Sequence, residues 1–216
     1  MKTRGLVSGG CLLILSLMLT GCATPKPYDY TNFRAHPPRS ILVLPPLTTS
    51  TAVAGTYGYL STVTFPLAEM GYYVYPVSVV DQFLKENGLP TAGEMHQVPL
   101  DKVREIIGAD AVLYLTLKQY GTKYEVLSSV TTVQVLGKLV DTRTGLVLWE
   151  GTGLGQKGSG GSGNLIADMI IAVGAQAVNT STDAAHNVCG GANNLMFLTK
   201  DHGLLYGPYH PQTENQ

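Results

Sequence analysis

The alternation of apolar and polar positions predicts strands and helices in turn over residues 41–110. Ile41–Leu44 is an unbroken apolar run followed by two prolines, which is typical of a strand covered on both faces. Apolar side chains recur at helical spacing from Tyr57 to Met70, and Pro66 should bend or divide that helix because it lacks an amide donor. Residues 72–77 predict a second strand, and two short helices follow. Because the strands are joined through helices, we expect parallel crossovers.

The next part of the chain predicts an antiparallel section of the same sheet. Ala111–Leu117 is a further apolar run, Tyr120 and Gly121 mark a break, and β-branched residues dominate from position 123 to 140. The polar turn Asp141–Gly145 then precedes another apolar run, which favours a hairpin. The expected fold class is therefore α/β, a single domain whose mixed sheet has parallel crossovers and then an antiparallel hairpin, packed by helices.

Three glycines after this hairpin form a G-x-G-x-x-G pattern: Gly153, Gly155 and Gly158. In a dinucleotide site a helix begins directly at such glycines, and its amides meet the pyrophosphate. Here residues 159–163 separate the glycines from the next predicted helix. We therefore interpret the glycine-rich segment 151–163 as a mobile loop and not as a nucleotide site.

Residues 164–178 form the most apolar helical stretch of the mature chain, with apolar side chains on nearly every face. At about fifteen residues this long helix is too short to span a bilayer. Three alternatives stay open for this helix: burial in its own domain, burial at a subunit interface, or contact with a membrane. The candidate interface is Ile166, Met169, Ile170 and Val173.

The amino terminus has the layout of a secretory signal peptide over residues 1–21. Two basic residues precede the uncharged run Cys11–Leu19, and small residues then lead to Cys22. An uncleaved transmembrane helix is the alternative, but the run is shorter than the roughly 20 residues that a bilayer core requires. The segment Leu19–Cys22 resembles a bacterial lipobox, in which cleavage makes the cysteine the first residue of the mature chain.

This resemblance implies lipidation of Cys22 with a diacylglyceryl group and an N-acyl chain. Residues 22–40 hold four prolines and no helical or strand period, which predicts a tether that extends by ~3.1 Å per residue, up to about 50 Å. Residues 201–216 are also aperiodic and predict an irregular tail. The periplasmic α/β domain should therefore span residues 41–200.

The charged residues and the cysteines limit which binding partners and which disulfides we expect for this chain. The chain has 14 Lys and Arg against 15 Asp and Glu, and loss of Lys2 and Arg4 with the signal leaves 14 − 2 = 12 basic residues. No segment clusters these residues, so no nucleic-acid partner is expected. Once Cys11 is removed and Cys22 is acylated, no other cysteine of the chain is left to form a disulfide with Cys189. We interpret it as a small buried residue, with an intermolecular disulfide or a reactive thiol as alternatives.

No combination of residues predicts catalysis or a metal site. His186 and Cys189 lie three positions apart and could share a helical face, but two ligands do not make a metal centre. Neither a G-x-S-x-G nor an S-x-x-K pattern occurs. We expect no catalytic residues, no metal and no cofactor besides the lipid on Cys22. A hydrolase that uses Cys189 with His186 is the enzyme alternative.

Four strings carry a family resemblance: Ser40–Pro46, Pro66–Pro76, Gly108–Tyr114 and Asp141–Trp149. Together they resemble a family of Gram-negative outer-membrane lipoproteins of unassigned function. Shorter forms are distantly similar to the periplasmic domain of the curli secretion lipoprotein CsgG and to the amino-terminal domain of TolB. The resemblance implies a mixed α/β domain that acts by assembly in the envelope. A pore like that of CsgG is not expected, because the one candidate hairpin has no clean apolar row.

These patterns predict a non-enzymatic lipoprotein anchored in the outer membrane, with its domain facing the periplasm. Ala23, and not aspartate, follows the acylated cysteine, which the lipoprotein resemblance associates with export to the outer membrane. The protein would form a homo-oligomer or join an envelope transport or secretion complex, with envelope proteins of a CsgG-like system as partners. The alternative is a periplasmic module that binds a ligand or a peptide in a cleft beside the glycine-rich loop.

Overall fold

The computed structural model describes residues 26–48, 55–124, 129–158 and 184–215. Its elements, in chain order, are α2 (Thr31–Ala35), β1 (Ser40–Val43), β2 (Leu47–Thr48), α3 (Gly55–Glu69), β3 (Tyr73–Val74), α4 (Val77–Glu86), α5 (Ala92–Met95), α6 (Leu100–Ile106), β4 (Ala111–Tyr124), β5 (Ser129–Asp141), β6 (Val147–Gly158), α8 (Ala184–Leu198) and the 3₁₀ turn η2 (Thr213–Asn215).

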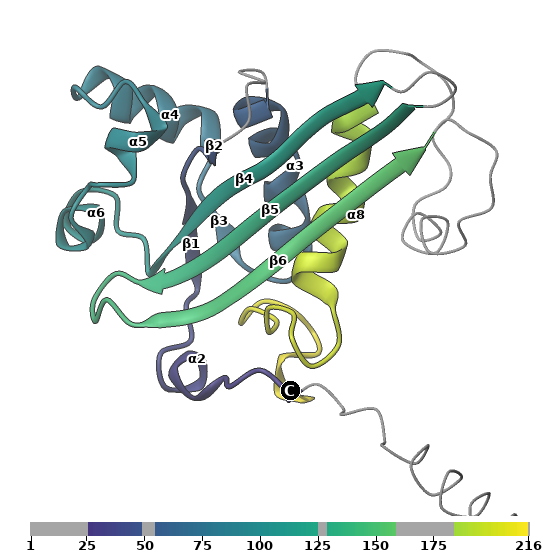
Figure 1. Cartoon of the computed structure of the whole chain (residues 1–216). Helices are drawn as coiled ribbons and strands as arrows, with labels where there is room; N and C mark the ends of the chain where they lie inside the picture. The colour runs from purple at the N-terminus through teal and green to yellow at the C-terminus, as the bar shows by residue number, and fades with distance from the viewer. Residues whose placement is uncertain (1–25, 49–54, 125–128, 159–183, 216) are drawn as a thin grey trace, which may run out of the picture.

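These strands form one mixed sheet of six strands in the order β3-β1-β4-β5-β6, with β2 paired to β4 (Figure 1). The pairs of β1 with β3, β1 with β4 and β2 with β4 are parallel. The long strands β4, β5 and β6 are antiparallel neighbours. The predicted fold class is therefore confirmed: a mixed α/β domain with parallel crossovers followed by an antiparallel hairpin.

Helices cover both faces of β1, as its unbroken apolar run predicts. Ile41 and Val43 belong to the main core, which α3 and α8 close on one side of the sheet. Leu42 and Leu44 belong to a second core, which α4, α5 and α6 close on the other side. Alternate residues of a strand point to opposite faces, so only a strand between two helical layers can be apolar throughout.

Helix α3 runs through Pro66, where the sequence predicts a bend or a break. In a regular helix the amide of residue 66 would donate to the carbonyl of Thr62, and proline has no such N–H. The side-chain amide of Asn193, on α8, donates to this carbonyl instead, at 3.1 Å. The carbonyl is thereby satisfied and the helix continues to Glu69.

Strand β4 likewise continues past the break predicted at Tyr120 and Gly121. A register shift between Leu117 and Gln119 introduces a bulge, and Gly121 adopts a φ of 134°, which side chains other than glycine rarely tolerate. The bulge allows the strand to extend to Tyr124. Tyr120, 9 % exposed, packs into the main core beside α3.

The interpretation of the glycine-rich segment as a mobile loop is wrong for residues 151–158, which form most of β6. A Cβ on Gly153 would lie 2.4 Å from the Ala192 carbonyl oxygen, and a Cβ on Gly155 would lie 2.4 Å from the Val188 carbonyl oxygen. The glycines therefore let the backbone of α8 lie directly on the strand. Residues 159–163 lie outside the described part of the chain.

The described part of the expected tether, residues 26–40, packs on the domain and contains α2. Phe33 is 4 % exposed and belongs to the main core, and Tyr28 and Tyr30 pack against it. Burial of these rings favours docking over extension. The expected irregular tail has only η2 as regular structure, but it also packs, since the Gly207 amide donates to the Met70 carbonyl at 2.7 Å.

Candidate functional site

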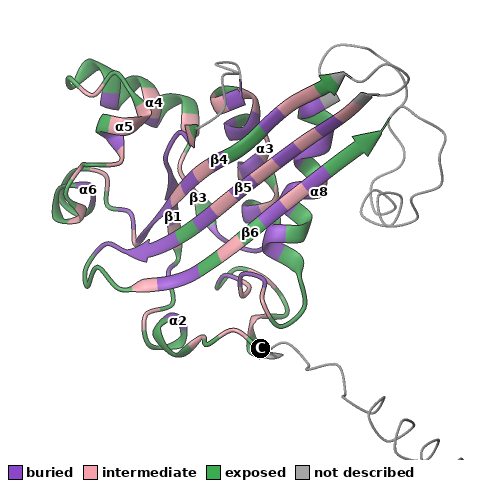
Figure 2. Ribbon diagram, viewed as in Figure 1, coloured by how far each residue is buried: buried purple, intermediate pink, exposed green. Residues whose placement is uncertain are grey.

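One face of the three long strands has no helix over it within the described residues. The helices α4, α5 and α6 pack over β1 and the start of β4, and the second core ends at Val112 with Tyr114 packed at its margin. Beyond this point α3 and α8 cover only the opposite face. Figure 2 shows the result as alternating buried and more exposed bands along β4, β5 and β6. We call the uncovered side of these strands the open face.

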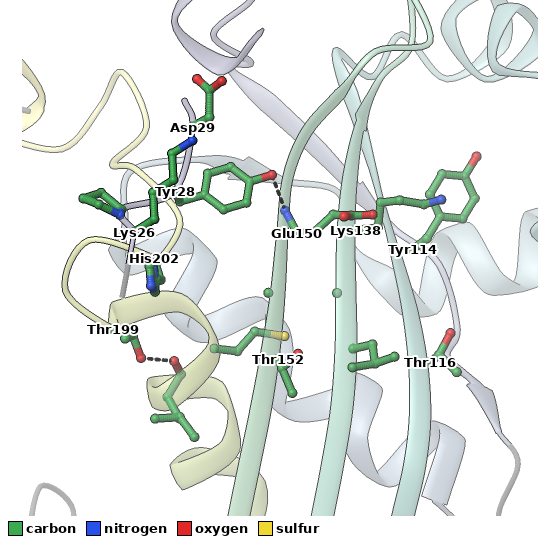
Figure 3. A pocket seen from close by; sticks show the side chains of 16 residues that line it. Lys26, Tyr28, Asp29, Tyr114, Thr116, Lys138, Glu150, Thr152, Thr199 and His202 are labelled. Atoms are coloured by element: carbon green, nitrogen blue, oxygen red, sulfur yellow. Dashed lines mark hydrogen bonds between the residues drawn. The ribbon is translucent and has the colours of Figure 1, made fainter. Parts of the chain in front are cut away.

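Strand register arranges the open face in rows. Tyr114, Lys138 and Glu150 are opposite one another on β4, β5 and β6, and their labelled side chains form one row in Figure 3. Thr116, Leu136 and Thr152 form the next row. The first row is charged and aromatic, and the second is a leucine between two hydroxyl groups. The open face therefore mixes apolar contact area with hydrogen-bonding groups, the usual composition of a non-obligate protein interface.

A groove of about 1020 Å³ extends from the open face around the edge of β6. Its walls come from the amino-terminal segment, from the three long strands and from the end of α8. The lining residues that Figure 3 labels are Lys26, Tyr28, Asp29, Tyr114, Thr116, Lys138, Glu150, Thr152, Thr199 and His202. The groove thus joins segments from both ends of the described chain.

Tyr28 holds the wall of this groove in place. Its amide donates to the Asp201 carbonyl at 2.9 Å, and its hydroxyl accepts from the Glu150 amide at 3.0 Å (Figure 3). The side chain of Asn32 donates to the Val147 carbonyl at 3.1 Å. Burial raises the pKa of the Tyr28 phenol, and the hydrogen bond from Glu150 opposes this rise. The phenol therefore stays neutral and can keep accepting at the edge of β6.

His96 borders the open face on its β4 side, next to Tyr114, which lies in the same row as Glu150. Its ring meets the Tyr114 ring edge to face, with centroids 5.3 Å apart, and its Nε2 lies 2.9 Å from the Pro45 carbonyl oxygen. Burial lowers the pKa of the imidazole, and the hydrogen bond to Pro45 acts in the opposite direction. The neutral ring with a proton on Nε2 fits this geometry, because a carbonyl can only accept.

The site residues predicted from sequence are not the residues that form the open face and its groove. Cys22 and the candidate interface of Ile166, Met169, Ile170 and Val173 lie outside the described residues. Cys189 is fully buried on α8, as interpreted, and its thiol donates to the Ala185 carbonyl at 3.2 Å. His186 is exposed, so the enzyme alternative of Cys189 with His186 has no accessible nucleophile.

Neither a metal-binding cluster nor a membrane-spanning helix occurs within the part of the chain that the structure describes. No group of three or more His, Cys, Asp or Glu side chains there could hold a metal ion. No helix there has the length and apolar character needed to cross a membrane.

Sequence reasoning missed both the open face and its amino-terminal wall. The spacing of Tyr28, Tyr30 and Phe33 was an available signal, because three aromatic residues within six positions are unusual for an extended tether. Helix α8 was also missed. Its buried face carries apolar residues at helical spacing, namely Ala185, Val188, Ala192 and Met196, so this spacing was an available signal.

The fold and this surface define a class, a single-sheet α/β protein with one open face on its antiparallel strands. The family described as "Putative lipoprotein GNA1162-like" matches residues 28–209, and the chain belongs to this lipoprotein family. It is 43% identical over 196 residues to "Putative lipoprotein NMB1124/NMB1162" of Neisseria meningitidis serogroup B, covering 89% of this chain and 91% of that protein.

A solved structure agrees with this assignment. The crystal structure of lipoprotein GNA1162 from Neisseria meningitidis is 45% identical, with a TM-score of 0.56, and the match covers 63% of this chain and 94% of that chain. These relatives carry names of lipoproteins and of no enzyme. They support the lipoprotein part of the predicted resemblance and give no specific support to CsgG or TolB, so that narrower likeness stays a prediction.

Proposed function

We propose that this protein is a non-enzymatic lipoprotein of the outer membrane that uses its open face to assemble with other proteins of the envelope. Lipid on Cys22 holds the domain on the periplasmic side of the membrane. The domain then acts as an assembling or accessory component of a transport or secretion complex. Membership of a lipoprotein family supports the anchor, and the open face supports the assembly role.

The open face is the observation that carries the assembly role. Rows such as Thr116, Leu136 and Thr152 offer a continuous surface on rigid strands, and the groove beside β6 adds a concave element. This uncharged row lies next to the row of Tyr114, Lys138 and Glu150, which carries two charged side chains. A protein partner with apolar side chains and hydrogen-bonding groups in alternation fits such a surface better than a purely apolar lipid phase does.

Photocrosslinking in intact cells tests this role. A photoreactive amino acid in place of Thr152 lies on the open face, whereas the same residue in place of Ser61 lies on the exposed side of α3, behind the sheet. We expect adducts from position 152 with a specific envelope protein or a second copy of this chain, and few adducts from position 61. Equal labelling from both positions, or none from position 152, would contradict the assembly role.

The groove favours a second candidate, the periplasmic module that binds a ligand or a peptide. Its volume of about 1020 Å³ is at the upper end of the range for small-molecule sites. A ligand seated there should raise the melting temperature of the wild-type protein and not that of a Thr152→Trp variant, whose indole fills the groove. Equal shifts in both proteins would place the ligand elsewhere.

A further inference from the structure

The amino-terminal segment packs on the domain from Tyr28 onward, much closer to Cys22 than the expected tether of residues 22–40 would allow. Tyr28 bonds to Asp201 and Glu150 through its amide and its hydroxyl. Two residues later the Tyr30 hydroxyl donates to the Gly203 carbonyl, and its ring packs on that of Tyr28 with centroids 4.9 Å apart. Phe33 then enters the main core. From Tyr28 onward the chain therefore cannot act as a spacer.

Only the five residues between Cys22 and Tyr28 remain to link lipid and domain. Six Cα-to-Cα steps of at most ~3.6 Å give a reach of about 20 Å. The thirteen residues of β5 alone extend for about 43 Å at ~3.3 Å per residue. A lipid anchor on Cys22 is thus attached by a link shorter than the domain, so the domain cannot turn freely above the membrane.

The link ends at one particular end of the domain. Glu150, which Tyr28 contacts, lies near the start of β6, whereas the strand ends at Gly158. The same end holds α2 and the turn between β5 and β6, because Arg143 in that turn lies 2.9 Å from the His36 ring through its guanidinium. Figure 1 shows the three long strands extending between this end of the domain and the start of α8.

Exposed side chains of both charges lie at this end, and the basic ones are available to lipid phosphates. Lys26, Arg34 and Arg143 are exposed there, and so are the acidic side chains Asp29, Glu150 and Asp201. Exposed basic side chains close to a bilayer are attracted by lipid phosphates.

Resting on the lipid anchor of the proposed function, we propose that the domain stands on the membrane with the Tyr28 and α2 end against the lipid headgroups. The long strands β4, β5 and β6 then project into the periplasm. Their far ends, at Tyr124, Ser129 and Gly158, are presented to partners at a distance from the bilayer. The occupant of the α2 surface is thus the lipid headgroup layer.

Fluorescence quenching in vesicles tests this orientation with the full-length lipidated protein. The vesicles contain phosphatidylethanolamine and phosphatidylglycerol with a headgroup-attached quencher. Ala35→Cys places a label on α2, and Lys157→Cys places one near the end of β6; both positions are exposed. Cys189 is fully buried and Cys22 is acylated, so labelling is confined to the new cysteine. Lys157 lies seven residues beyond Glu150, about 23 Å along the strand.

We expect severalfold stronger quenching at position 35 than at position 157. Insertion of a Gly-Ser linker of about twenty residues between Pro25 and Lys26 should remove most of this difference. Equal quenching at both positions in the uninserted protein, with the protein bound to the vesicles, would overturn the orientation and leave the anchor intact. Protein that stays in solution would overturn the anchor itself and the orientation with it.

Discussion

Asn193 on α8 donates its side-chain amide to the Thr62 carbonyl on α3, 3.1 Å away, where Pro66 offers no backbone donor. The same amide reaches the Thr62 hydroxyl at 3.2 Å, and its oxygen accepts from the Tyr59 hydroxyl. Asn193 is 2 % exposed, so these bonds are shielded from water. One buried side chain thus completes α3 and joins it to α8.

Asn193→Ala should lower the free energy of unfolding by about 2–4 kcal/mol. The substitution leaves a buried carbonyl and a buried phenol without their partner, and each costs its full desolvation. Urea unfolding measures the effect. Asn194→Ala, at an exposed neighbouring position, should change the value by less than about 0.5 kcal/mol. Similar losses in the two variants would refute the role of Asn193.

Gly153→Ala should destabilise the protein by about 1–3 kcal/mol or more, because the new Cβ would press on the Ala192 carbonyl oxygen and push α8 from β6. Gly158 is the matched control in the same strand, since nothing lies within 4 Å of a Cβ placed there. Thermal unfolding of the two alanine variants gives the comparison. A Gly153→Ala protein as stable as Gly158→Ala would mean that α8 does not lie against the strand in this way.

The half-buried imidazole of His96 should make stability depend on pH. Burial holds its pKa in the folded state below the ordinary 6.5, and the bond to Pro45 offsets only part of this. As the pH falls through 6.5 the unfolded chain takes up a proton first, so the wild type loses stability until the folded-state pKa is reached, and the loss then stops. Urea unfolding at pH values from about 8 to 5 should show this step.

The His96→Gln variant should lack the step, and His186→Gln, at an exposed position of α8, should retain it. Identical pH profiles for wild type and His96→Gln would contradict the assignment.

Asp141 should stabilise the turn between β5 and β6 at neutral pH. Its buried position tends to raise the carboxyl pKa, but hydrogen bonds from Thr144 and Arg143 outweigh this and lower it. Asp141→Ala should therefore cost about 1–3 kcal/mol near pH 7. The difference from wild type should shrink as the pH falls below the ordinary value of 3.8, because protonation removes the same stabilisation.

Chemical denaturation of Asp141→Ala at neutral and acidic pH provides the test. Glu86→Ala, at an exposed position of α4, serves as the control. A penalty for Asp141→Ala that is the same at both pH values would argue against the ionised carboxylate.

Thr152→Arg should weaken assembly without weakening the fold. The residue is exposed on the open face, so a larger charged side chain obstructs a partner and costs less than about 0.5 kcal/mol of stability. Yield of partner adducts from a photoreactive residue at Leu136, next to it on β5, should fall severalfold. Ser61→Arg, on the far side of the molecule, should leave the adduct yield unchanged. If Ser61→Arg lowered the yield as much as Thr152→Arg does, the loss would be a general effect of the added charge and would contradict the role of the open face.

Local patterns predicted those parts of the fold that depend on neighbouring residues. The run Ile41–Leu44 indicates burial on both faces, and the Asp141–Gly145 turn indicates the hairpin, since each depends on the chemistry of a few consecutive positions. The resemblance of Leu19–Cys22 to a lipobox is a local pattern of the same kind, and it stays a prediction because these residues lie outside the described part of the chain. Such features can be found from one sequence.

The rest depends on partners far away in the chain. The glycines of β6 resemble a loop until Ala192 and Val188 are seen above them, and Pro66 resembles a helix end until Asn193 is seen beside Thr62. The open face is a property of the whole sheet, because no single strand reveals which side the described helices leave uncovered. The spacing of apolar residues along the chain shows neither these long-range contacts nor the open face.

The contacts of Tyr28 and Tyr30 also set an order of events during biogenesis. Their acceptors, Asp201 and Gly203, are synthesised about 173 residues later. In the lipoprotein that we propose, a nascent polypeptide crossing the inner membrane cannot form these contacts until that distant stretch has emerged, because loop closure over such a separation requires both ends. The end that we propose to be acylated would thus be the first part of the protein to be exported and the last to be fixed in place. Any premature truncation would then leave the molecule attached to its lipid by a loose strand.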